Sequence, residues 1–175
     1  MPYNPNLLHR RSIRLKDYDY SLPGAYFITL VTWQRSWLFG IITNGEMQLN
    51  PFGHIVADRL NRLPNVNTWI VMPNHVHLIY MIEPSDDQLS DNKIDHDDHP
   101  EKVVTPTLSL PAMIQNYKSV TTRLINNQRR ITGTAVWQRN YYEHIIRSFK
   151  ELMRISDYIA NNPRDWAEDP ENIKV

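Results

Sequence analysis

The sequence predicts an α+β protein with a ferredoxin-like antiparallel sheet and helices mainly on one face. Three observations carry this prediction: runs rich in β-branched and aromatic residues, segments with apolar residues at helical spacing, and the order of the two kinds. That order is strand, helix, strand, strand, helix, strand, helix. A length of 175 residues suits one domain, so we expect residues 1–175 to form a single unit.

The first strand and the first helix are expected in the N-terminal part of the chain. Gly24 precedes the β-rich run 25–33, which is expected to be a central strand. A helix is expected to begin near Pro51, because proline is favoured in the first turn. Its apolar stripe consists of Phe52, Ile55, Val56, Leu60 and Leu63.

Two strands and a second helix follow. The runs Thr68–Met72 and His75–Ile82 are joined so tightly that they predict an antiparallel hairpin. The second helix is expected from about Ser109 to Gln128. Residues at helical spacing there are Leu110, Met113, Ile114, Tyr117, Thr121 and Leu124.

The last strand and helix complete the pattern. Val136 to Ile146 is predicted to be a strand, and the final helix opens with the Ser-x-x-Glu capping box of Ser148 and Glu151. That helix is expected to end before Pro163.

Charge is unevenly distributed, although the chain has 19 basic and 19 acidic residues. The segment of about 84–105 has almost no large apolar residues and is expected to be a mobile acidic loop. Without the stretch 85–101, the chain keeps 18 basic and 12 acidic residues. This balance, with a basic arm at about 1–20, suits a nucleic-acid binder and is also common in other proteins.

Several classes of function are excluded by what the sequence lacks. The absence of cysteine rules out disulfides, thiolate catalysis and a cysteine-ligated zinc site. No apolar run approaches the roughly 20 residues that span a bilayer, and no signal-peptide pattern is present. The sequence therefore predicts a cytoplasmic protein with no membrane partner.

The segment His75-Val76-His77 is the first candidate for chemistry. Alternate residues of a strand face the same side, so both imidazoles should project together. Two neutral imidazoles suit a divalent cation better than an apolar core. The alternative is a pair of strand histidines that hydrogen-bond to neighbours.

Tyr158 and Asn162 are the second candidate. A helical wheel predicts that Phe149, Leu152, Met153, Ile159 and Ala160 pack on the sheet, with Tyr158 on the opposite side beside Glu151, Arg154 and Asn162. Asn162 lies one turn beyond Tyr158, although it can also serve as a helix C-cap before Pro163. Tyr117 is the alternative nucleophile, but its place in an apolar stripe favours core packing. His54 and His144 are expected to be structural.

These residues resemble a known family. Pro73-Asn-His-Val-His77 resembles the His-hydrophobic-His motif of HUH endonucleases, and Tyr158-Ile-Ala-Asn-Asn162-Pro163 resembles the catalytic helix of single-tyrosine HUH transposases. Resemblance to the REP-associated tyrosine transposase branch covers most of the chain except the acidic loop. The segments that carry it are Arg11–Leu15 with Asp19 and Tyr20, Pro23–Tyr26, Trp137–His144 and Tyr158–Trp166.

The resemblance implies a site and a reaction. His75, His77 and Asn162 would hold Mg²⁺ or Mn²⁺, and Tyr158 would attack DNA to give a 5′-phosphotyrosine. Asn162 departs from the Gln of the broader family, but Asn followed by Pro is typical of the REP-associated branch. The implied partner is single-stranded hairpin DNA, a REP-like palindrome, bound by a monomer or homodimer.

Basic residues suited to DNA phosphates occur along the chain. They are Arg10, Arg11, Arg14, Lys16, Lys118, Arg123, Arg129, Arg130 and Arg154. The arm 10–16 either follows a groove or is a solvated terminus, and Trp33 or Trp37 can stack on bases or be buried. Two other classes remain open: a non-catalytic hairpin-binding module of the same fold, and a metal-dependent hydrolase that activates water.

Overall fold

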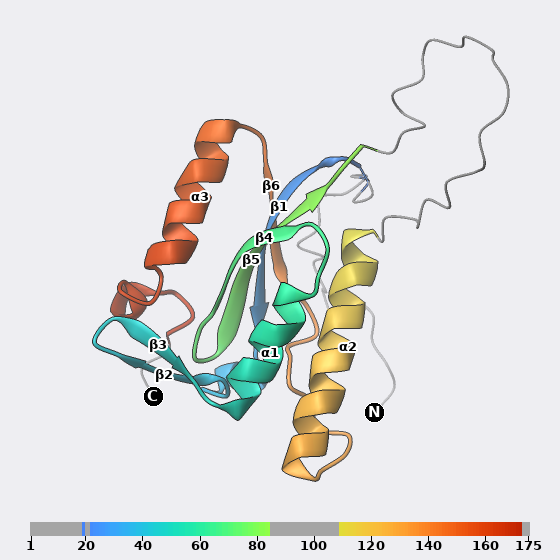
Figure 1. The fold of residues 1–175 in the computed structure, drawn as a ribbon, viewed down its shortest axis with the longest axis vertical. Coiled ribbons are helices and arrows are strands. Elements are labelled where there is room, and N and C mark those ends of the chain that lie inside the picture. Colours follow the sequence, from blue (N-terminus) through green and yellow to red (C-terminus); the bar gives the residue numbers. More distant parts are fainter. Residues whose placement is uncertain (1–18, 20–21, 85–108, 173–175) are drawn as a thin grey trace, which may run out of the picture.

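A four-stranded antiparallel sheet is the centre of the molecule, seen in a computed structural model that describes residues 19, 22–84 and 109–172 (Figure 1). The strand order is β4-β5-β1-β6. These strands are β1 (Gly24–Val31), β4 (Val66–Val71), β5 (His75–Ile82) and β6 (Tyr142–Ile146). The α+β, ferredoxin-like prediction is confirmed, as is the β4–β5 hairpin.

The helices cover both faces of the sheet. Helices α1 (Pro51–Asn61) and α2 (Leu110–Arg129) lie on one face and α3 (Phe149–Asn161) lies on the other (Figure 1). Even-numbered β1 and β5 residues such as Ile28 and Leu78 belong to the large core with α1 and α2. Odd-numbered residues such as Phe27 and Ile79 pack with α3. The period-2 alternation thus assigns each strand side chain to one of two cores.

A small hairpin lies outside the predicted order. β2 (Gly40–Thr43) pairs with β3 (Glu46–Leu49) to form a separate two-stranded sheet. The turn uses Asn44 and Gly45 with φ of 55° and 77°, which suits an Asn-Gly hairpin turn. The Asn-Gly pair in the sequence could therefore have predicted this hairpin. The predicted order of strands and helices left it out.

The predicted strand 136–146 was too long. Only Tyr142–Ile146 forms β6, and Trp137 makes an isolated bridge to Thr32. The intervening chain leaves the ladder because the Lys118 ammonium donates to the carbonyl oxygens of Gln138, Arg139 and Asn140, at 2.9, 3.4 and 3.1 Å. The first strand is also shorter than predicted, because a short 3₁₀ turn, η1 (Trp33–Arg35), replaces its end.

The predicted faces of the last helix were right in part. Leu152 and Ile159 pack on the sheet as predicted, together with Ile155, which the prediction left out. Phe149 and Met153 were predicted wrongly, because they are 76% and 47% exposed, and Ala160 is exposed as well. Tyr158 and Asn162 flank the packed side of the helix, so both reach the sheet. The Ser148 side chain caps the helix as predicted, accepting from Glu151 N, while Glu151 reaches Arg147 N.

Two predicted features fall outside the described residues: the basic arm of about 1–20, Asp19 excepted, and nearly all of the acidic loop 84–105. Among the described residues, no helix has both the length and the apolar character needed to cross a bilayer.

Candidate active site

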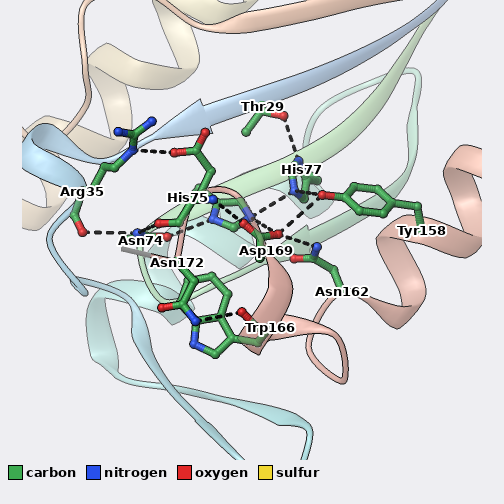
Figure 2. A network of polar contacts seen from close by, with 11 residues as sticks. Thr29, Arg35, Asn74, His75, His77, Tyr158, Asn162, Trp166, Asp169 and Asn172 are labelled. Carbon is green, nitrogen blue, oxygen red and sulfur yellow. Dashed lines mark hydrogen bonds and ion pairs between the residues drawn. The ribbon is translucent and has the colours of Figure 1, made fainter. Parts of the chain in front are cut away.

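The two histidines start β5 and face the α3 side of the sheet. His75 is fully buried and His77 is 4% exposed. Thr29 lies opposite His77 in the β1–β5 ladder, and its hydroxyl is 2.9 Å from Nδ1 of His77. Asn74 Oδ1 is 2.9 Å from Nδ1 of His75 (Figure 2). Both rings are thus held through Nδ1, with Nε2 turned toward a common point.

Asn74 determines which nitrogen of His75 carries the proton. Its Nδ2 donates to the carbonyl oxygens of Arg35 and Glu171, at 3.2 and 2.7 Å. The amide oxygen therefore faces His75, and only a protonated Nδ1 can donate to it. Nε2 of His75 is left with a lone pair, which is the form that binds a metal. The Thr29 hydroxyl can donate to His77 or accept from it, so it suits either tautomer of that ring.

The two Nε2 atoms are 3.0 Å apart. Burial lowers the pKa of His75, with Asp169 and Glu171 opposing this effect. Burial and the neighbouring His75 lower the pKa of His77 well below the usual value. Both imidazoles are therefore neutral near pH 7 and available as ligands.

Tyr158 points from α3 toward this pair. Its hydroxyl is 3.3 Å from Nε2 of His77 and donates to Oδ2 of Asp169 at 3.4 Å. Its ring packs edge-on against Phe27 while the side chain stays 39% exposed, so the hydroxyl is fixed at a site that opens to solvent. Burial, followed by the Asp169 carboxylate, raises the pKa of Tyr158 to about 12.

Asn162 is the residue after α3, and its side chain is buried in the same cluster. Nδ2 donates to Oδ2 of Asp169 at 2.8 Å. Oδ1 is buried and has no hydrogen-bond partner among the residues that the structure describes. A buried acceptor without a donor is costly, so this oxygen is the expected place for a group that the protein itself does not supply. Asn162 is thus both the C-cap residue and part of the site.

Asp169 is the site residue that sequence reasoning missed. It lies after the 3₁₀ turn η3 (Trp166–Glu168), 7% exposed, with Oδ2 3.9 Å from Nε2 of His75. One ligand atom each from His75, His77 and Asp169 lie within 4.8 Å of one another. Asp169 lies in a turn, where no helical or strand periodicity could identify it. The segment that resembles the family ended at Trp166, so the resemblance did not include it either.

The turn that carries Asp169 is anchored on both sides. Oδ1 of Asp169 accepts from Glu171 N at 2.7 Å, and the Glu171 carboxylate accepts from Arg35 Nε at 2.7 Å. Asn74 Nδ2 reaches the Glu171 carbonyl oxygen, so the residue that orients His75 also holds this turn (Figure 2). Trp166 is buried and its ring centroid lies 5.9 Å from that of His75.

The donors present fit a divalent cation. Two neutral imidazoles and a carboxylate offer ligand atoms that lie within 4.8 Å of one another, and the amide oxygen of Asn162 belongs to the same cluster. Imidazole and oxygen donors are compatible with Mn²⁺, and oxygen donors with Mg²⁺. The predicted trio of His75, His77 and Asn162 is brought together, with Asp169 added.

Within residues 22–84 and 109–172, the predicted DNA-binding cations are spread over several places. Arg10, Arg11, Arg14 and Lys16 lie outside the described residues. Lys118 and Arg123 line one cavity beside α2, Arg129 stacks on Phe52 with 4.8 Å to the ring centroid, and Arg130 caps α2 at φ 57°. Arg154 is exposed on α3, 3.9 Å from Glu151.

The remaining candidates are one tyrosine, two histidines and two tryptophans. Tyr117 is buried and donates to the Val56 carbonyl oxygen at 3.1 Å, so it is a core residue. His144 bonds Glu151 at 2.8 Å, and His54 is exposed on α1. Trp33 and Trp37 are 48% and 51% exposed.

Comparisons with known proteins found two related sequences and one similar solved structure. No family model matches the chain. It is 37% identical over 175 residues, 95% of both chains, to an uncharacterized protein of Haemophilus influenzae. It is 25% identical over 146 residues, 83% of this chain and 73% of the relative, to a "Putative REP-associated tyrosine transposase" of the same organism. A solved REP-associated tyrosine transposase bound to a REP hairpin gives a TM-score of 0.49 at 20% identity, over 89% of this chain and 74% of that one.

The chain is thus similar in sequence to a protein described as a putative REP-associated tyrosine transposase. Its own structure combines an antiparallel sheet, the His75–His77 pair and a tyrosine on α3.

Proposed function

We propose that the protein is a metal-dependent transposase that cleaves and rejoins single-stranded DNA at REP-like hairpins through a 5′-phosphotyrosine intermediate. The observation that carries the proposal is the position of the Tyr158 hydroxyl, 3.3 Å from Nε2 of His77 and beside the orphaned Oδ1 of Asn162. A structural tyrosine would not need two ligand-ready imidazoles and an unpartnered amide oxygen beside it.

The metal would be held by Nε2 of His75, Nε2 of His77 and Oδ1 of Asn162, with Asp169 as a further ligand. When bound, Mg²⁺ or Mn²⁺ supplies Lewis-acid stabilisation to charge on an oxygen of the scissile phosphate. Asn74 and Thr29 contribute by holding the two rings through Nδ1. Such partners of metal-ligating histidines fix the tautomer and the ring orientation.

Tyr158 acts as the nucleophile. Its oxygen forms a bond to phosphorus as the bond from phosphorus to the 3′ oxygen breaks, so the phosphoryl group stays on Tyr158 through the 5′ side. The phenol loses its proton, for which Oδ2 of Asp169 is the nearest carboxylate acceptor at 3.4 Å. The leaving 3′ oxygen takes up a proton and becomes a hydroxyl.

The raised pKa of Tyr158 sets a requirement on this step. In the protein without a cation, burial and Asp169 keep the phenol protonated at neutral pH. Positive charge at the site reverses the effect of the carboxylate, so ionisation of the nucleophile depends on ligand binding. Because the number of phosphodiester-type bonds is conserved, a 3′ hydroxyl can reverse the reaction without ATP.

The test is a covalent-adduct assay with 3′-labelled single-stranded DNA. The probe is a pool of hairpins with randomised stems and flanks, incubated with Mn²⁺ and separated on a denaturing protein gel. A 5′-phosphotyrosine retains the 3′ fragment, so a 3′ label moves with the protein and a 5′ label is released. Tyr158→Phe should abolish the adduct.

Matched controls are Tyr117→Phe, which alters a buried tyrosine, and Tyr142→Phe, which alters a tyrosine 52% exposed on β6. Both should retain the adduct. Cleavage without an adduct would favour a hydrolase that activates water, and hairpin binding without cleavage would favour a recognition module. An adduct that persists in Tyr158→Phe would overturn the assignment of the nucleophile.

A further inference from the structure

A cavity lies on the opposite side of the sheet from the active site, between the second half of α2 and the segment 131–139. Its volume is about 590 Å³, within the range of small-molecule sites. Its lining includes Lys118, Arg123 and Arg139, and no acidic residue among the described ones. The cavity therefore carries excess positive charge.

The cations differ in their freedom to bind a ligand. Lys118 is engaged by three backbone carbonyl oxygens, as described above. Arg123 and Arg139 are exposed and pair with no carboxylate in the part of the chain that the structure describes. Two free guanidinium groups at one cavity match the charge and geometry of a phosphate.

Asn126 adds a different kind of signal. It lines the same cavity and is 6% exposed, and its Nδ2 donates to the Thr134 carbonyl oxygen at 2.8 Å. This bond leaves Oδ1 buried and without a donor among the described residues. The cavity wall thus combines two guanidinium groups with the apolar surface of Ile131 and Ala135, and Asn126 lies beneath it.

The cavity and the candidate active site lie at the same end of the sheet, on opposite faces. The cavity wall is tied to the end of β1 by Trp33 N to Val136 O at 2.8 Å and Gln138 N to Val31 O at 2.9 Å. Val31 is paired with His75 on the next strand. Within the plane of the sheet, two strand spacings amount to roughly 10 Å.

We propose that this cavity binds one unpaired nucleotide of the single-stranded DNA on which Tyr158 acts. The phosphate lies on Arg123 and Arg139, and the base lies on the apolar wall formed by Ile131 and Ala135. This inference rests on the proposed function for the choice of ligand, and its test requires neither metal nor cleavage.

The experiment measures binding in EDTA by fluorescence anisotropy of labelled decathymidylate. Arg123→Gln/Arg139→Gln should weaken binding by about tenfold or more, because charge-assisted phosphate contacts are lost. The matched control, Arg62→Gln/Lys150→Gln, removes two exposed cations outside the cavity. Thr122→Trp, which fills the cavity without changing charge, should also weaken binding.

Thymidine 5′-monophosphate titrated into ¹⁵N-labelled protein provides a second readout. The amide of Gly133 and the indole of Trp137 at the cavity should shift, at lower concentrations than inorganic phosphate requires. Equal affinity for phosphate, or equal binding by the arginine variant and its control, would overturn the nucleotide site. If the nucleotide site fails these tests but the covalent adduct still forms, the proposed function stands and only the nucleotide site is rejected. If nucleotide binding is intact but no adduct forms, the nucleotide site stands and the proposed function is rejected.

Discussion

Oδ2 of Asp169 accepts a 2.8 Å hydrogen bond from Nδ2 of Asn162. This bond joins the turn after α3 to the end of the helix that carries Tyr158, and it leaves the other amide atom, Oδ1, without a partner. The carboxylate thus orients the amide while lying 3.4 Å from the tyrosine hydroxyl. Its charge and its geometry can be tested separately.

Asp169→Asn should lower the pKa of Tyr158 from about 12, because it removes a negative charge beside the phenol. Burial is the largest cause of the shift, so the pKa should remain above the usual value. Absorbance titration of the phenolate, with the Tyr158→Phe curve subtracted, measures the change. An unchanged pKa would show that the carboxylate does not act on the phenol.

Asn162→Ala should weaken Mn²⁺ binding by about ten- to a hundredfold, since it removes an oxygen donor and releases Asp169. The matched control is Asn161→Ala, because the Asn161 side chain bonds only within its own helix, to Asp157 O at 2.8 Å. Isothermal titration calorimetry gives both dissociation constants. Equal constants for the two variants would remove Asn162 from the site.

Acid should destabilise the protein in EDTA. Burial lowers the pKa of both site histidines in the folded chain, so below about pH 6.5 the unfolded chain binds more protons than the folded one. The free energy of unfolding therefore falls as the pH drops from about 6.5 toward the lowered pKa values. Urea unfolding at a series of pH values measures this slope.

The comparison for the acid effect is His75→Asn/His77→Asn, in which both groups are absent. Its slope between pH 6.5 and 5 should be smaller than that of the wild type. Added Mn²⁺ should raise the stability of the wild type alone, because it binds only the folded site. Identical slopes in the two proteins would mean that the histidines titrate normally.

Gly53→Ala should destabilise the fold by about 1–3 kcal/mol through overpacking. A Cβ atom at Gly53 would lie 2.2 Å from the Phe39 carbonyl oxygen and 2.9 Å from Cδ2 of Leu49. Helix α1 must therefore move away from the β2–β3 hairpin. Urea unfolding should show the loss, whereas His54→Ala, an exposed neighbour on α1, should change stability by less than about 0.5 kcal/mol.

Local patterns determined much of the fold. Helix α1 begins at the predicted Pro51, and the β4–β5 hairpin was also predicted. The apolar stripes of α1 and α2 could be predicted because each depends on the spacing of residues within one segment. The period of two along β5 also placed both histidines on one face. The direction of α3 was not readable, since apolar residues lie on two of its sides and only the sheet decides which side is buried.

The sequence by itself identified the four residues of the candidate site that belong to motifs: His75, His77, Tyr158 and Asn162. Only the tertiary structure decided that Asp169 joins them, since its position depends on the contacts of Glu171 with Arg35 and Asn74, far away in the chain. The same holds for the cavity of Arg123 and Arg139, which α2 and a connecting segment form together. The periodicity of apolar residues predicts which face of a single helix or strand is buried. A site formed by several elements depends on how those elements pack together.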